Sequence, residues 1–201
     1  MNPSGHALKM AELRAAIAAT PKLRAGTFGV AKETSNLFRD RTRSRQPRIP
    51  LQHFNEVIAV GLGAYAVQAE GMTSYAALVD ATLARGVMPV VVPQLKSITV
   101  GGALAGIGIE ATSFRQGLVH EGVIAFDALT GDGRIVHCTP DNEHRDLFFG
   151  FANSYGTLGY ALAVTLRTQP VKPFVALEHR RHANVRECLA DLARRCDAPE
   201  R

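Results

Sequence analysis

Apolar and polar residues recur along the chain with spacings that predict a helix followed by a series of short strands. Residues 7–19 are dominated by alanine, leucine and charged residues, which favour helix. Leu8, Ala11, Ala15 and Ala18 can form one apolar stripe on it. Apolar runs bounded by turn residues then predict short strands. These are residues 26–31, and a small meander of 49–51, 57–60 and 64–69.

A second helix is predicted where Thr73 or Ser74 can act as an N-cap. Its apolar face consists of Tyr75, Leu78, Val79, Thr82 and Leu83. A glycine at position 86 is well placed to end the helix, and the continuous apolar run that follows predicts a buried strand. A strand, a helix and a strand in this order predict a crossover unit.

The second half of the chain predicts a hairpin, two helices and further strands. Thr130-Gly131-Asp132-Gly133 is typical of a hairpin turn between strands at 122–129 and 134–139. Asp141 or Asn142 is expected to cap a short helix whose apolar residues Leu147, Phe148 and Phe151 face the core. The remaining predicted elements are strands at 160–168 and 174–179 and an amphipathic helix at 185–196.

Length and composition favour a folded α+β protein. The chain has 201 residues, of which 46% are hydrophobic, enough for one large domain or two lobes. No apolar run is long enough for a transmembrane helix, and no secretory signal is recognisable. The three cysteines are odd in number and lack metal-ligand spacing, so we expect no metal site and a cytoplasmic location.

The net charge of +5 is concentrated in five arginines between residues 39 and 48. A solvated loop is the favoured interpretation of this segment, and attraction of anionic substrates or a membrane surface is the alternative. No aromatic platform accompanies the arginines, so nucleic acid is not an expected partner.

Residues 93–117 contain five glycines among small and apolar residues. Glycine at this density suggests tight turns, or a backbone that lies close to another group and offers its N–H groups to phosphate oxygens. The alternative is a buried turn between two core elements. Residues 101–105 are predicted to form a short helix or a turn rather than a strand, so the segment is not a Rossmann fingerprint, and no P-loop motif is present.

Two further turns are rich in hydroxyl, amide and glycine residues, at 32–38 and 153–159. The N–H groups of the turn at 32–38 can converge on an anion, although an ordinary N-cap or turn is the interpretation that its spacing alone favours. His120 and Tyr155 are candidate acid/base groups only by chemical type. His120 is expected to be a structural histidine with its hydrogen bonds satisfied.

The order and spacing of these motifs resemble the FAD-binding domain of the vanillyl-alcohol oxidase / para-cresol methylhydroxylase (PCMH-type) superfamily, and within it the delta-24-sterol reductase-like FAD-linked oxidoreductases. The resemblance covers about residues 26–173. The motifs that carry it are Lys32–Arg39, Glu70-Gly71-Met72-Thr73, Pro93-Gln94-Leu95, Thr99-Val100-Gly101-Gly102, Gly106-Ile107-Gly108-Ile109-Glu110 and Gly156-Thr157-Leu158-Gly159.

The resemblance implies an α+β fold of two subdomains with FAD between them. It implies an N-terminal helix at 1–20, FAD-binding subdomains at 21–93 and 94–173, and the start of a substrate cap domain at 174–201. It also implies which residues contact FAD. These are Thr34, Ser35, Asn36, Leu37, Pro93, Gln94, Thr99, Val100, Gly101, Gly102, Gly106, Gly108, Ile109, Glu110, Ser113, Gly156, Thr157 and Gly159.

Family members carry a cap domain beyond this point, whereas this chain ends at Arg201, so we expect the cap to be largely absent. The segment 34–37 holds no histidine or cysteine, which favours non-covalent FAD. No catalytic acid or base is assigned. The expected function is a flavin-dependent oxidoreductase acting on a small molecule, a sterol-like alkene or a sugar-derived alcohol, with an electron donor or acceptor. The alternatives are a non-catalytic FAD-binding module and a basic adaptor that uses the arginine segment.

Overall fold

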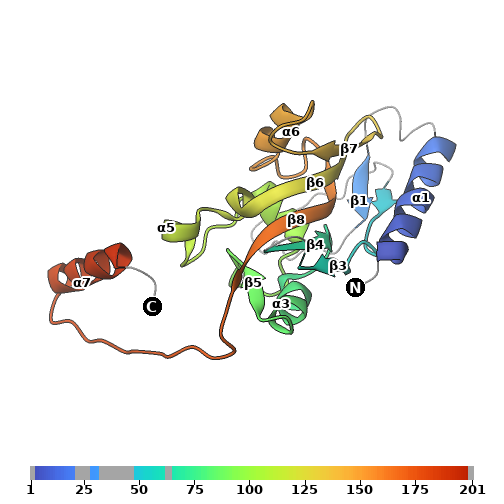
Figure 1. The fold of residues 1–201 in the computed structure, drawn as a ribbon. Helices are drawn as coiled ribbons and strands as arrows, with labels where there is room; N and C mark the ends of the chain where they lie inside the picture. The colour runs from blue at the N-terminus through green and yellow to red at the C-terminus, as the bar shows by residue number, and fades with distance from the viewer. Residues whose placement is uncertain (1–2, 21–27, 32–47, 62–64, 199–201) are drawn as a thin grey trace. The chain divides into compact units, whose positions relative to one another are not determined.

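The computed structural model describes residues 3–20, 28–31, 48–61 and 65–198. The chain divides into two compact units, residues 1–171 and 172–201. The first unit combines helices with a mainly antiparallel sheet (Figure 1), so the predicted α+β class is confirmed. The predicted segment 34–37 and most of the arginine segment lie outside the described residues.

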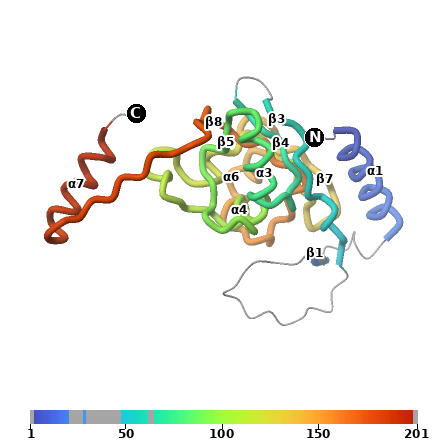
Figure 2. Tube along the Cα trace, turned by 90° about the horizontal axis from the view of Figure 1, so that it is seen from below, coloured from blue at the N-terminus to red at the C-terminus, as the bar shows by residue number. Residues whose placement is uncertain are grey.

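The N-terminal helix α1 (Pro3–Ala19) forms as predicted but buries a different face. Its buried residues are Leu13 and Ile17, whereas Leu8 of the predicted stripe is 62% exposed. The prediction was wrong because alanines mark a helical face only weakly, and the two large aliphatic side chains bury more apolar area. In both views α1 lies at the end of the unit where β1 lies, away from α3 (Figure 2).

Two sheets account for the strands of the described residues. A short parallel pair joins β1 (Gly29–Ala31) to β2 (Arg48–Pro50). The larger sheet has the order β3-β4-β8-β6-β7, and β5 also pairs with β8. The predicted meander is therefore wrong for β2, which pairs with β1 instead of β3. The larger sheet consists of β3 (Val57–Val60), β4 (Ala66–Glu70), β5 (Val87–Pro89), β6 (Val123–Leu129), β7 (Ile135–Cys138) and β8 (Tyr160–Pro170).

The predicted crossover is present around β8. Both β4 and β5 pair antiparallel with β8, so they run in the same direction, and α3 (Tyr75–Leu83) connects them. Ser74 is the N-cap of α3, where its side chain accepts a hydrogen bond from the Ala77 N–H at 3.3 Å. β4 and β5 both pair with β8 and do not pair with each other.

Short helices follow in the second half of this unit. The predicted helix at 101–105 is α4 (Val100–Gly106), and the hairpin of β6 and β7 is also confirmed. The helix α6 (Arg145–Gly150) has His144 as its N-cap, so the predicted caps at 141 or 142 are wrong. Asn142 instead closes a turn with its side-chain oxygen, which accepts from the His144 N–H at 3.0 Å. The other short helices are α5 (Ser113–Gln116) and the 3-10 helix η1 (Val119–Gly122).

Two hydrophobic clusters hold the first unit together. The larger packs α3 and α4 against β4, β6 and β8, with Tyr75, Leu104 and Phe126 among its buried residues. The smaller joins α1 and residues 49–54 to the ends of β6 and β8. The larger sheet takes strands from both predicted FAD-binding subdomains, so residue 93 is not a boundary between sheets. The division into two FAD-binding subdomains stays a prediction.

The second unit contains α7 (Val185–Asp197), which confirms the predicted C-terminal helix. The predicted strand at 174–179 is wrong, because these residues are exposed and pair with no strand in the described part of the chain. An apolar run forms a strand only where a neighbouring strand accepts its backbone hydrogen bonds. None of the described helices is long and apolar enough to span a membrane. Cys138, Cys188 and Cys196 form no disulfide in the part of the chain that the structure describes.

Candidate functional site

The glycine-rich segment begins with the first turn of α4. Thr99 is the N-cap, and its hydroxyl oxygen accepts from the Gly102 N–H at 3.2 Å. The Gly101 N–H donates to the Gly71 carbonyl at 2.8 Å. Two of the N–H groups that we expected to face a phosphate are therefore already hydrogen-bonded within the protein.

Close packing explains the glycines at this end of the segment. A Cβ on Gly101 would lie 2.9 Å from the Gly71 carbonyl oxygen and 3.3 Å from the Ala161 Cβ. A Cβ on Gly71 itself would lie 1.9 Å from the Ala161 carbonyl oxygen. These glycines let α4 lie directly on β4 and β8, so the interpretation of a buried turn between core elements applies to this part of the segment.

The end of α4 departs from helical geometry at Ile107, whose φ is +53°. A β-branched residue rarely adopts positive φ, because its Cβ approaches the backbone. The next residue, Gly108, accepts a hydrogen bond at its carbonyl from the Val119 N–H at 3.0 Å. A Cβ on Gly108 would lie 2.5 Å from Val119 Cγ2 and 3.9 Å from Pro93 Cγ. The turn at 107–108 is thus held between Pro93 and η1.

The remaining predicted residues of this segment form a hydrogen-bonded loop. The Glu110 carboxylate accepts from the Gln94 N–H at 3.0 Å, and the Ser113 hydroxyl accepts from the Glu110 N–H at 2.9 Å. Ile109 between them is 72% exposed. Pro93, Gln94, Gly108, Glu110 and Ser113 are therefore brought together as predicted.

The turn at 153–159 packs against the end of α4. The Tyr155 N–H donates to the Ala105 carbonyl at 3.0 Å, and a Cβ on Gly106 would lie 3.7 Å from the Tyr155 ring. Within the turn, the Ser154 carbonyl accepts from the Thr157 N–H at 3.0 Å and from the Thr157 hydroxyl at 2.7 Å. Two of the three predicted FAD-contacting segments are thus adjacent, and the third lies outside the described residues.

Backbone conformation and close packing explain the two glycines of this turn. Gly159 has a φ of +142°, and a Cβ there would lie 2.5 Å from the Leu129 carbonyl oxygen. Gly156 has a φ of +87° and lies beside the Tyr160 ring. The Tyr160 ring in turn lies 6.5 Å from the Phe28 ring, centroid to centroid, next to the start of β1.

Backbone strain is concentrated where these two segments meet. Among the described residues, the non-glycine residues with positive φ are Ile107, Asn153 and Tyr155. All three lie in the glycine-rich segment or in the 153–159 turn. Positive φ at non-glycine residues persists only where the surrounding structure enforces it, and such positions cluster at ligand-binding sites.

Three buried side-chain polar atoms of residues linked to these two segments have no hydrogen-bond partner among the described residues. They are the Tyr75 hydroxyl, His120 Nδ1 and Ser154 Oγ. Tyr75 interacts electrostatically with Glu110, His120 follows the Val119 that bonds to Gly108, and Ser154 precedes the Tyr155 that bonds to Ala105. Burial, together with the negative charge of Glu110, raises the pKa of the Tyr75 hydroxyl well above its ordinary value. Buried polar groups are almost always paired, so these three need an explanation.

These three atoms were the least predictable part of the site. The expectation of a histidine with satisfied hydrogen bonds at position 120 is wrong for Nδ1, which has no partner within the described part of the chain. Tyr75 was predicted only as an apolar position of α3, and Ser154 only as a turn residue. No sequence pattern could identify them, because burial and hydrogen-bond pairing depend on tertiary packing.

Exposed apolar side chains lie along the same two segments. Ile109 and Phe114 follow α4, and Tyr155 and Leu158 lie in the second turn, all of them at least 42% exposed. A flat aromatic ligand can cover such side chains, which gains about 25 cal/mol per Å² of apolar area removed from water. The site therefore offers both polar and apolar contacts.

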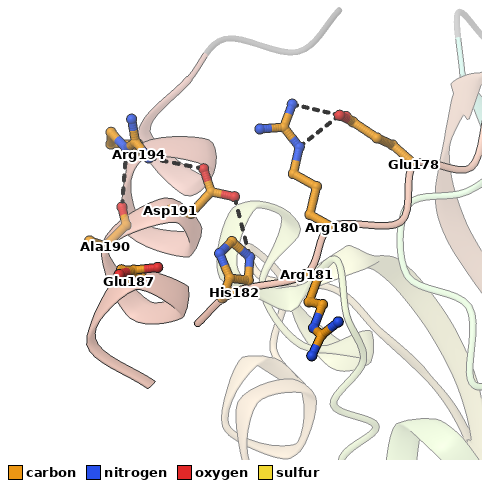
Figure 3. Close-up of a pocket in the computed structure, with 8 residues that line it drawn as sticks. All are labelled: Glu178, Arg180, Arg181, His182, Glu187, Ala190, Asp191 and Arg194. Carbon is orange, nitrogen blue, oxygen red and sulfur yellow. Dashed lines mark hydrogen bonds and ion pairs between the residues drawn. The ribbon is translucent and has the colours of Figure 1, made fainter. Parts of the chain in front are cut away.

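A charged hollow lies in the second unit. Residues 178–194 enclose an open space of about 590 Å³ (Figure 3). Asp191 accepts from Arg194 at 3.1 Å and from Arg195 at 3.0 Å, and the Arg195 hydrogen bond lowers the pKa of this carboxyl. Glu178 pairs with Arg180 at 2.6 Å. This network is solvated, and it contains none of the predicted FAD-contacting residues.

Comparison with known proteins identifies the family. Residues 9–139, more than half of the chain, match the model of the family described as FAD binding domain. A Delta(24)-sterol reductase from Pisum sativum is 30% identical over 70% of this chain and 25% of that protein. The Delta(24)-sterol reductase from Homo sapiens is 41% identical over 43% of this chain and 17% of that protein.

A more distant relative is Cytokinin dehydrogenase 6 from Oryza sativa subsp. japonica, 36% identical over 57% of this chain and 22% of that protein. The chain thus spans about a quarter or less of the length of these curated relatives. The predicted cofactor, FAD, and the predicted PCMH-type α+β fold are confirmed at the level of the family. The chain belongs to the FAD binding domain family.

Proposed function

We propose that this chain is the cofactor-binding part of a flavin-dependent oxidoreductase, and that FAD binds non-covalently where residues 105–113 meet residues 153–157. The single observation that carries the proposal is the coincidence of strained backbone and unpaired buried polar atoms at this contact. A strained backbone and an unpaired buried polar atom each cost free energy in the FAD-free protein. The contacts and hydrogen bonds of a bound ligand offset these costs.

The residues present fit FAD. Its flavin, ribityl and diphosphate parts need both hydrogen-bond donors and apolar faces, and these two segments offer both. Gly106 has room for a Cβ at an ordinary distance of 3.7 Å from the Tyr155 ring, so its backbone is accessible to an approaching group. When bound, FAD supplies the redox chemistry of the family, and the protein supplies binding and orientation.

Hydrogen bonds within the chain hold residues 105–113 and 153–157 in place. The Gln94 N–H fixes one Glu110 oxygen, and the Tyr155 N–H fixes the end of α4. These contacts keep the cofactor-facing backbone in one conformation before FAD arrives. Prearrangement of this kind improves affinity because less conformational entropy is lost on binding.

Cys138 is not a point of covalent FAD attachment. Cys138 is fully buried in the core, and burial raises the pKa of its thiol to about 11, so it is a poor nucleophile. Denaturation of the FAD-loaded protein in acid is expected to release all flavin into the supernatant. Flavin that stays with the precipitated chain would contradict this part of the proposal.

The substrate class is also a proposal. Relatives named Delta(24)-sterol reductase favour a sterol-like alkene over a sugar-derived alcohol. The chain spans only part of those proteins, and no described residue is assigned as catalytic acid or base. Turnover of a sterol alkene with a hydride donor, above the background of free FAD, would distinguish an enzyme from a non-catalytic FAD-binding module.

The position of the site is tested at Gly106. A Cβ at Gly102 would lie 2.8 Å from the Thr99 hydroxyl that caps α4, so substitution there would also disturb the helix. Gly106 avoids this conflict. We expect Gly106→Asp to weaken FAD binding about tenfold by charge repulsion, and Gly106→Asn to have a smaller effect. Titration of FAD fluorescence measures both, and unchanged affinity of Gly106→Asp would place FAD elsewhere.

A further inference from the structure

We infer that the hydroxyl of Tyr75 donates a hydrogen bond to the uncharged flavin or ribityl part of FAD, an inference that rests on the proposed function. Tyr75 belongs to none of the motifs that define the cofactor segments. It is the first residue of α3, its side chain is 1% exposed, and its hydroxyl has no partner among the described residues.

The position of Tyr75 is fixed relative to the glycine-rich segment. Its N–H donates to the Ile98 carbonyl at 2.9 Å, and the preceding Ser74 forms a β-bridge with Thr99, the N-cap of α4. The ring packs in the cluster that contains Val100 and Leu104 of α4. Tyr75 therefore moves little relative to the segment proposed to hold FAD.

The hydroxyl is unfavourable in the protein by itself. An unpaired buried hydroxyl costs about 1–3 kcal/mol, whereas phenylalanine would fill the same apolar space without that loss. Burial raises the pKa of Tyr75 above its ordinary value, so the hydroxyl stays protonated at physiological pH and is available as a donor. A partner that arrives with a ligand explains why a hydroxyl is present at this position.

Glu110 indicates which part of FAD this partner belongs to. Its carboxylate is close enough to raise the pKa of Tyr75, yet the two groups share no hydrogen bond. One Glu110 oxygen is already bonded to the Gln94 N–H. A carboxylate near the hydroxyl repels the doubly negative diphosphate, so the uncharged flavin and ribityl groups are the favoured neighbours.

The test compares wild type with Tyr75→Phe in three measurements. Stability of the FAD-free protein is measured by urea unfolding, and binding of FAD, riboflavin and ADP by titration. We expect unchanged or higher stability without FAD, and a three- to tenfold loss of affinity for FAD and riboflavin but not ADP. The control is Tyr65→Phe, which removes the hydroxyl of a half-exposed tyrosine and should change none of these values.

Each other outcome overturns a defined statement. If wild type binds no FAD, the proposed function fails. If wild type binds FAD and Tyr75→Phe binds it equally well, only the role of Tyr75 fails. Loss of stability in FAD-free Tyr75→Phe would show that the hydroxyl is bonded within the protein or to a structural water, and would overturn the inference. A loss of affinity for ADP rather than riboflavin would overturn the assignment to the flavin part.

Discussion

Two buried polar sites lie five residues apart in the sequence and differ in how well they are satisfied. Glu70, at the end of β4, is fully buried, and its carboxylate accepts from His6 and Lys9, each at 2.8 Å, and from the Glu56 N–H at 2.9 Å. Tyr75, at the start of α3, is equally buried but has no partner for its hydroxyl among the described residues.

The difference separates architecture from ligand binding. Glu70 joins α1 to the large sheet, and its own chain supplies every partner, so nothing further is needed at that site. By contrast, the Tyr75 hydroxyl, His120 Nδ1 and Ser154 Oγ are buried and have no hydrogen-bond partner among the described residues. A buried polar group with complete pairing points to stability, and one without it points to a ligand.

The strongest expected effect is at Glu70. Glu70→Ala should lower the free energy of unfolding by about 3 kcal/mol, because it leaves His6 and Lys9 without their buried partner. FAD affinity of the folded fraction should change little. Urea unfolding measures the loss, with Glu12→Ala on the exposed face of α1 as the control. A large loss of FAD affinity without a loss of stability would show that Glu70 serves FAD binding and not stability.

Acid should act through the same carboxylate. Burial raises the pKa of Glu70, but hydrogen bonds from His6 and Lys9 and from the Glu56 N–H outweigh it, so the net pKa lies below the ordinary value of 4.5. A lowered pKa in the folded state stabilises the protein above pH 4.5, and this contribution is lost as pH falls through the folded pKa. Glu70→Gln should therefore show a flatter loss of stability below pH 4.5 than wild type. Identical acid unfolding curves would exclude this role.

Local sequence signals predicted the elements whose structure depends on nearby residues. The N-cap at Ser74 is confirmed, as is the glycine turn of the hairpin, where the Thr130 N–H donates to the Arg134 carbonyl at 2.9 Å. The strand at 174–179 was wrong because a strand needs a partner that local composition does not specify. Glycine density marked residues 93–117 and 153–159 as candidate cofactor contacts, but it did not distinguish close packing at Gly101 from strain at Ile107.

Strain in the 153–159 turn gives the next prediction. Asn153 has a φ of +63°, which asparagine tolerates and a β-branched residue adopts only at a cost in free energy. Asn153→Val should lower the free energy of unfolding by about 1–2 kcal/mol, whereas Asn153→Gly should change it little. Thermal and urea unfolding distinguish the two variants. Equal stability of both would mean that the turn relaxes, and that its conformation is not enforced by the packing of Tyr155 against Ala105.

The smallest stability effect is expected at Ser154. The comparison of Ser154 with Thr157 tests an unpaired hydroxyl against a paired one within a single turn. The Thr157 hydroxyl donates to the Ser154 carbonyl, so Thr157→Ala should cost about 1 kcal/mol of unfolding free energy. The Ser154 hydroxyl is buried and unpaired among the described residues, so Ser154→Ala should leave the FAD-free protein as stable as wild type. FAD affinity of Ser154→Ala should fall severalfold, because the hydroxyl that the cofactor would bond is gone. If Ser154→Ala instead destabilises the FAD-free protein as much as Thr157→Ala does, the hydroxyl has a partner within the protein or in bound water, and the distinction between paired and unpaired groups no longer identifies the cofactor site.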